Sequence, residues 1–176
     1  MKKINLVLGT MAIAACGFIS CSDDDNDGTS VKISGTYELN EVNTENATDF
    51  NMDGTANVNQ VKESSCYNDG RIILNDDGTL KFTITKILID ETDGSVGCAS
   101  SFQASGLWEA ESVTGTATTI TATYTDQTGN NQSITLVKDG NELTYSDDTV
   151  LSAYPDRNAN DEAVYTLGST TYVFKK

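Results

Sequence analysis

The chain has 176 residues, with 11 Lys and Arg against 26 Asp and Glu, no His, four Cys and one Pro. This length suits one domain with a substantial core. The formal net charge of −15 argues against nucleic acid as a partner and against direct attraction to anionic membrane surfaces. Without His, the chain cannot form a Ser-His-Asp triad, a Cys–His pair or an imidazole zinc site, and we expect no enzyme.

The first 20 residues have the anatomy of a secretory signal. Lys2 and Lys3 give a short basic start, and residues 4–19 are mostly apolar. The apolar segment is too short and too interrupted to span a bilayer. Cys16 and Cys21 each follow small or apolar residues, as in the lipobox of bacterial lipoproteins. We assign lipidation to Cys21, because cleavage at Cys16 would leave a spare thiol outside the membrane.

An acidic run follows Cys21 at residues 22–28. It resembles the export signal that sends some bacterial lipoproteins to the outer face of the outer membrane, although a solvated linker without address value would look the same. We expect acyl chains on Cys21 to attach the protein to the outer membrane, facing the cell exterior. Residues 21–31 would then be an extended tether before a folded domain at residues 32–176.

Two cysteines remain in the predicted mature body. Cys66 and Cys98 would lie in an oxidising compartment, where a disulfide is the default state. It would close a loop of roughly 30 residues and stabilise the fold by about 3–4 kcal/mol on the chain-entropy model. The alternative is a pair of free thiols, which neither a His nor a C-x-x-C spacing would activate.

The body reads as all-β, because short alternating runs are separated by turn residues. In chain order the runs lie near residues 35–42, 72–74, 80–84, 119–125, 133–136, 143–145, 164–166 and 172–174. Asp, Asn and Gly at residues 75–78, 129–131 and 139–141 predict tight hairpin turns. A sandwich would also fit, but alternation with one polar face favours one closed sheet, an antiparallel up-and-down barrel of 8–10 strands. Residues 47–69 form an insertion after the first strand, with a short helix expected near residues 58–64.

Several of these features resemble the lipocalin-like domains of bacterial surface lipoproteins. Gly35-Thr36-Tyr37 opens the first strand as Gly-X-Trp opens lipocalins, Cys66 precedes a strand, and a second cysteine, Cys98, precedes a Gly-X-Trp strand at residues 106–108. The resemblance covers about residues 33–176 and implies a calycin-type β-barrel and a small apolar ligand. Tyr37 stands where lipocalins have Trp, and no Arg near the C-terminus is evident to pack on it.

One loop has the spacing of a calcium site. Residues 49–55 place oxygens at positions 1, 3 and 5, Gly at 6 and a backbone carbonyl at 7. Position 12, where a calcium loop has a bidentate Glu, is occupied by Gln60. Glu63 could supply the carboxylate instead if residues 58–64 are helical. The predicted ligands are Asp49, Asn51, Asp53, Thr55 and Glu63. A plain Asx-turn loop is the alternative, because residues 23–28 show the same pattern and residues 156–162 a weaker one.

Aromatic and acidic side chains on the strands allow two interpretations each. Trp108 would line a cavity or pack in the core. The tyrosines Tyr124, Tyr145, Tyr165 and Tyr172 would form a stacking platform for carbohydrate or pack between strands. Glu109 and Glu111, near Trp108, are expected to face solvent.

We therefore expect a surface binding module that engages a small apolar molecule, a glycan or a protein. The alternative is a structural accessory lipoprotein of an envelope complex, without a small-molecule ligand. An apolar cavity of about 300 Å³ or more would favour the binding module. A barrel filled by Phe82, Phe102, Tyr124 and Phe174 would favour the structural role.

Overall fold

The structure is a computed structural model that describes residues 32–90, 92–126 and 128–176. The predicted signal peptide and tether, with Cys16 and Cys21, lie outside the described residues. In the part of the chain that the structure describes, no helix is long and apolar enough to cross a membrane.

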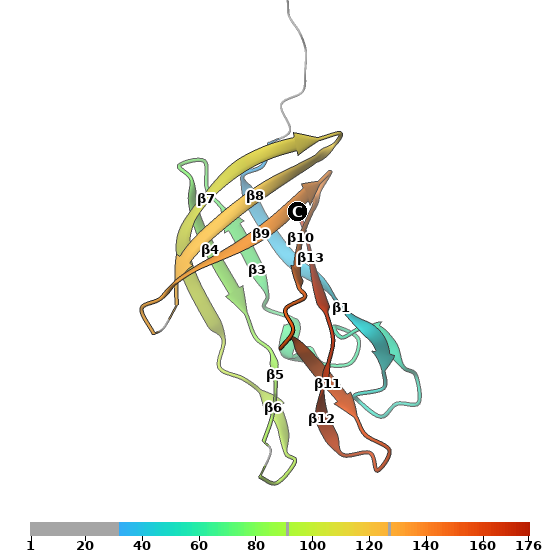
Figure 1. Ribbon diagram of the computed structural model, residues 1–176. Helices are drawn as coiled ribbons and strands as arrows, with labels where there is room; N and C mark the ends of the chain where they lie inside the picture. The colour runs from blue at the N-terminus through green and yellow to red at the C-terminus, as the bar shows by residue number, and fades with distance from the viewer. Residues whose placement is uncertain (1–31, 91, 127) are drawn as a thin grey trace, which may run out of the picture. The chain divides into compact units, whose positions relative to one another are not determined.

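Eight antiparallel strands form a closed barrel, which confirms the predicted architecture (Figure 1). Around the barrel they are β1 (Gly35–Thr48), β3 (Arg71–Leu74), β4 (Thr79–Ile84), β7 (Phe102–Thr114), β8 (Ala117–Thr125), β9 (Asn131–Asp139), β10 (Glu142–Asp147) and β13 (Thr170–Lys175). Each strand pairs with the next barrel strand along the chain, and β13 pairs with β1 to close the sheet. The order is therefore that of an up-and-down barrel.

The alternating pattern places one parity of each strand inside. On β4, Leu80, Phe82 and Ile84 are buried, while Lys81 between them is exposed. This alternation follows from the two-residue repeat of a pleated strand. The fully buried large hydrophobic side chains of the barrel strands are Tyr37, Val42, Ile72, Leu74, Leu80, Ile120, Leu136, Leu143 and Phe174.

The two ends of the barrel differ in their connections. At the short-turn end the hairpin turns are brief, at residues 75–78, 115–116 and 140–141, and the chain enters and leaves there, next to Gly35 and Lys175. At the open end three long connections, residues 49–70, 85–101 and 148–169, and one short connection between β8 and β9 join the strands. Side chains on these long connections can therefore surround the open end.

The long connections at the open end contain short elements of their own. The hairpins β5 (Ile87–Ile89) with β6 (Val96–Cys98) and β11 (Ala153–Arg157) with β12 (Ala163–Leu167) project from this end of the barrel (Figure 1). The first connection contains β2 (Asn57–Asn59), which pairs with β1, and the 3-10 helix η1 (Ser65–Tyr67).

The helix expected near residues 58–64 is wrong in position. Val58 lies in β2, and a turn at Gln60–Ser64 leads into η1 instead. The side chain of Asn59 explains the difference, because its Oδ1 accepts hydrogen bonds from the backbone N–H groups of Val42 and Val61, each at 3.1 Å. An Asn that bonds to nearby backbone in this way favours a turn over a helix.

At the short-turn end, a cation covers the aromatic residue of the first strand. The Lys176 Nζ lies 5.7 Å from the centroid of the Tyr37 ring and donates a hydrogen bond of 2.7 Å to the carbonyl of Ser34. Tyr37 itself is fully buried, and its hydroxyl donates to the carbonyl of Ile33. A lysine thus packs on the first-strand ring, where the sequence offers no arginine.

Candidate functional site: the aromatic mouth of the barrel

Aromatic rings fill the barrel interior below the open end. Phe82 contacts Phe102 and Phe174 edge to face, with ring centroids 5.9 Å and 6.3 Å apart, and Phe102 contacts Tyr124 in the same way at 5.9 Å. These separations lie in the range that favours edge-to-face pairs. The four rings that would fill the barrel in a structural role therefore form one connected cluster.

Above this cluster the barrel opens into a cavity of about 320 Å³, which we call the mouth cavity. Its lining consists of Phe82, Ile84, Lys86, Ala99, Ser100, Phe102, Tyr124, Tyr145 and Tyr172. Five of these nine residues are aromatic, and one is charged. The volume reaches the lower end of the range for small-molecule sites, and a mostly apolar lining is typical of such sites.

Strand register sets one wall of the mouth cavity. Tyr145 on β10 and Tyr172 on β13 are direct partners across the two strands, and their rings stack with centroids 5.7 Å apart at 19°. Side chains of directly opposite residues are close enough to stabilise each other. The pair therefore presents a fixed aromatic surface.

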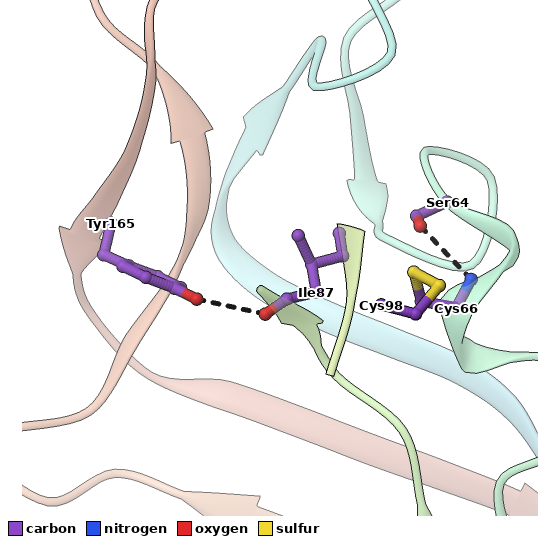
Figure 2. The surroundings of a disulfide bond; sticks show 5 residues. All are labelled: Ser64, Cys66, Ile87, Cys98 and Tyr165. Carbon is purple, nitrogen blue, oxygen red and sulfur yellow. Dashed lines mark hydrogen bonds between the residues drawn. A yellow bond between two sulfur atoms is a disulfide. The ribbon is translucent and has the colours of Figure 1, made fainter. Parts of the chain in front are cut away.

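The opposite wall is held by the disulfide between Cys66 and Cys98, which confirms the predicted pairing (Figure 2). The two Cα atoms lie 5.3 Å apart, and the bond joins η1 to the end of β6. Cys98 is followed directly by Ala99 and Ser100, both of which line the mouth cavity. The disulfide thus ties this wall to the first long connection.

Tyr165 holds the same hairpin from the other side. As Figure 2 shows, its hydroxyl points at β5, where it donates a hydrogen bond of 3.0 Å to the Ile87 carbonyl. It also accepts one of 3.2 Å from the Ile89 N–H. Tyr165 does not line the mouth cavity, whereas the other three tyrosines of the predicted stacking platform do.

Lys86 is the one charged side chain in the lining. Its Nζ lies 5.6 Å from the centroid of the Tyr172 ring, and no carboxylate of the described residues lies within ion-pair distance of it. Lys86 also lines a smaller hollow of about 80 Å³ beneath β11 and β12. Sequence analysis missed this residue, because an isolated lysine between two strands carries no motif.

The phenols of the mouth cavity remain protonated at neutral pH. Burial, followed by the negative charge of Asp147, raises the pKa of Tyr145 from 10.0 to about 12. The same two causes raise the pKa of Tyr172 well above its usual range, and burial raises that of Tyr124. The hydroxyls are therefore neutral groups that can donate hydrogen bonds.

A larger hollow of about 770 Å³ lies between the two hairpins. Its lining includes Asp90, Asp93, Arg157 and Glu162, and it adjoins position 91, which lies outside the described residues. Its lining is more polar than that of the mouth cavity, so it matches the usual small-molecule site less well.

The predicted calcium loop is compact, and the structure brings its residues together. The carboxylate of Asp49 accepts hydrogen bonds from the N–H groups of Asp53 (3.0 Å) and Gly54 (2.9 Å), and that of Asp53 accepts one from Thr55 N–H at 2.8 Å. Gly54 has a φ of 87°, which favours glycine. These are Asx-type turns, and among the described residues no three acidic, Cys or His side chains are grouped closely enough to hold a metal ion.

Glu63 reaches back to this loop without a helix. It is 4% exposed, its Oε2 accepts a hydrogen bond of 3.2 Å from Asn51 N–H, and its Oε1 accepts one of 2.6 Å from the Asn57 side chain. Gln60 is fully buried at the base of the loop, where its side-chain amide donates to Thr48 Oγ1 at 2.8 Å. The two residues thus have different roles: Glu63 contacts the loop, and Gln60 packs beneath it.

The remaining candidates lie away from the mouth cavity. Trp108 packs against the core near the short-turn end, where its Nε1 donates a hydrogen bond of 3.0 Å to the Asn75 carbonyl. Glu109 and Glu111 are exposed on β7, as expected. Residues 156–162 span the end of β11 and the tip of the β11–β12 hairpin, in which Asn158 Oδ1 accepts hydrogen bonds from backbone N–H groups.

The chain was also compared with known proteins. No family model matches it, and searches of curated proteins and of solved structures found no significant match.

Proposed function

We propose that this chain is a lipid-anchored binding module of the bacterial outer membrane and that the mouth cavity binds a small, largely apolar molecule. The observation that carries the proposal is the cavity of about 320 Å³ with five aromatic residues in its lining. Burying apolar ligand surface contributes roughly 25 cal/mol per Å², so such a lining favours ligands rich in rings or alkyl chains.

The proposed anchor fits the way in which the chain enters the barrel. Lys32 precedes β1 at the short-turn end, and the mouth cavity opens at the other end. The predicted tether from an acylated Cys21 would therefore join the barrel through Lys32. Cys21→Ala should abolish labelling by a fatty-acid analogue in cells, whereas Cys16→Ala should not; normal labelling of the Cys21 variant would refute this assignment.

Binding in the mouth cavity can be tested with an uncharged fluorescent probe, phenylnaphthylamine. Ala99→Trp should fill the cavity and weaken binding about tenfold or more, because Ala99 is half-buried in the lining. Ser112→Trp, an exposed position on β7, is the matched control and should leave the affinity unchanged. Tyr145→Ala, which removes a wall instead of filling the cavity, provides a second variant. Equal affinity in all four proteins would refute the proposal.

A structural accessory role is the second candidate. The edge-to-face cluster of Phe82, Phe102, Tyr124 and Phe174 favours it, because these rings fill the interior below the mouth. Such a protein would bind no small molecule. The phenylnaphthylamine titration separates the two candidates, since only the binding module predicts a response to Ala99→Trp.

A calcium site in the loop at residues 49–55 is a separate proposal. The burial of Glu63 favours it, since no lysine or arginine of the described residues lies within ion-pair distance of this carboxylate. A buried carboxylate without a counter-charge is costly, and a cation would relieve that cost. Binding would require Asp49 and Asp53 to turn oxygens from backbone N–H groups toward the ion.

A further inference from the structure

We propose, building on the function proposed above, that the mouth cavity selects a ligand with an aromatic or apolar body and one anionic group, which pairs with Lys86. The chemical class is an amphipathic monoanion, such as an aromatic carboxylate or sulfonate. The juxtaposition that carries the inference is a single unpaired ammonium at the edge of a cavity otherwise lined by rings and neutral side chains.

The backbone of Lys86 is fixed where it borders the cavity. Lys86 lies between β4 and β5, and its carbonyl accepts a hydrogen bond of 2.9 Å from the N–H of Ala99. Ala99 follows the disulfide-bonded Cys98. The backbone of Lys86 is therefore fixed at the edge of the cavity, and its flexible side chain can adjust to the ligand.

Nothing else among the described residues accounts for the charge of Lys86. Among the described residues its ammonium contacts the face of Tyr172, and a cation–π contact at an exposed site is weak. A carboxylate or sulfonate is a stronger partner for an ammonium than a ring face is, because the hydrogen bond between them carries charge on both groups.

Two carboxylates whose charges act on the tyrosines of the mouth cavity, Asp147 and Asp126, already have hydrogen-bond donors. Asp147 accepts a hydrogen bond from the hydroxyl of Ser152. Asp126 is engaged in the turn after β8, where it accepts hydrogen bonds from Thr128 and from the Asn130 N–H. These acidic groups are therefore tied to their own loops, and in a chain with a net charge of −15 the ammonium at the cavity is a local exception.

Two probes of similar shape test the role of charge. Anilinonaphthalene sulfonate carries one negative charge, and phenylnaphthylamine is its uncharged analogue. Both would be titrated by fluorescence into the wild-type protein, Lys86→Met and Lys81→Met, the last being an exposed lysine of β4 that does not line the cavity. Lys86→Met should weaken binding of the sulfonate about tenfold, the effect of losing one charge-assisted contact. The loss should be several times smaller for phenylnaphthylamine, which has no charge to pair with Lys86, and Lys81→Met should affect neither probe.

The outcomes distinguish this inference from the function on which it rests. If both probes bind in the mouth cavity but Lys86→Met leaves the sulfonate affinity unchanged, the charge assignment is wrong and the apolar site stands. If neither probe responds to Ala99→Trp, the proposed function itself fails. Lys86→Arg should restore the sulfonate affinity, and a loss of binding in that variant would also contradict the inference.

Discussion

Lys176 lies over the ring of Tyr37, with its Nζ 5.7 Å from the ring centroid, and so joins the last residue of the chain to the first strand of the barrel. The same ammonium donates to the carbonyl of Ser34, which precedes β1. Because β1 and β13 are the two strands that close the barrel, this contact fastens the closure at the short-turn end. It acts at the end opposite to the mouth cavity.

Lys176→Gln should therefore lower the free energy of unfolding by about 1 kcal/mol, through the loss of a cation–π contact and a charge-assisted hydrogen bond. Lys175→Gln is the control, because its ion pair with Glu142, at 3.1 Å, is exposed and should contribute about 0.5 kcal/mol or less. Urea denaturation of both variants measures the difference. A larger loss in Lys175→Gln would contradict the role given to Lys176.

Removal of the disulfide tests the wall of the mouth cavity. The double substitution Cys66→Ser and Cys98→Ser should lower stability by about 3–4 kcal/mol, since the bond constrains the unfolded chain between residues 32 positions apart. It should also weaken phenylnaphthylamine binding, because Ala99 and Ser100 lose their support. Reductant should reproduce both effects in the wild-type protein and have no effect on the double variant. Two free thiols in protein isolated from the cell envelope would contradict the pairing.

The buried tyrosines predict a loss of stability in alkali. The pKa of Tyr145 is raised from 10.0 to about 12 in the folded protein, so its contribution is fully present below pH 10. It is lost as the pH rises from 10 through about 12, because the unfolded state releases the proton first. Phenolate absorbance should show a titration step near pH 12 that is absent in Tyr145→Phe, while Tyr172 still titrates above its usual range. Complete ionisation of the tyrosines near pH 10 while the protein stays folded would contradict the burial of these phenols.

The calcium proposal predicts a metal-dependent melting temperature. Calcium at a hundred times its Kd would stabilise the folded state by about 2.7 kcal/mol, and chelator would remove this gain. Asp53→Ala should abolish the response without unfolding the barrel, whereas Asp69→Ala, an exposed carboxylate with no place in the pattern, should retain it. A melting temperature indifferent to calcium in the wild-type protein would leave the loop as a plain set of Asx turns.

The barrel could be predicted because its signals are local. The alternation of Leu80, Phe82 and Ile84 and the Asn-Asp-Asp-Gly turn before them each act within a few residues, so they can be read without the fold. The pairing of Cys66 with Cys98 was predictable for a different reason, since the predicted mature body contains no other cysteine.

The mouth cavity could not be predicted, because it depends on register and on long connections. Tyr145 and Tyr172 stack since β10 and β13 pair in one register, and a shift of one residue would turn each ring to the other face. Lys86 borders the cavity because the β5–β6 hairpin is held by Tyr165 and by the disulfide, contacts that join residues far apart in the chain. The predicted helix at residues 58–64 was wrong for a similar reason, because the side chain of Asn59 accepts a hydrogen bond from Val42 on β1, a residue distant in the chain.

The most direct test of the account is an NMR titration of the wild-type protein with anilinonaphthalene sulfonate, observed at the aromatic side chains. We expect shifts concentrated on the rings that line the mouth cavity, with little change at Trp108 near the short-turn end. These rings are Phe82, Phe102, Tyr124, Tyr145 and Tyr172. Shifts confined to residues outside this cavity, or no saturable shifts at all, would contradict the claim that the barrel mouth is a ligand site.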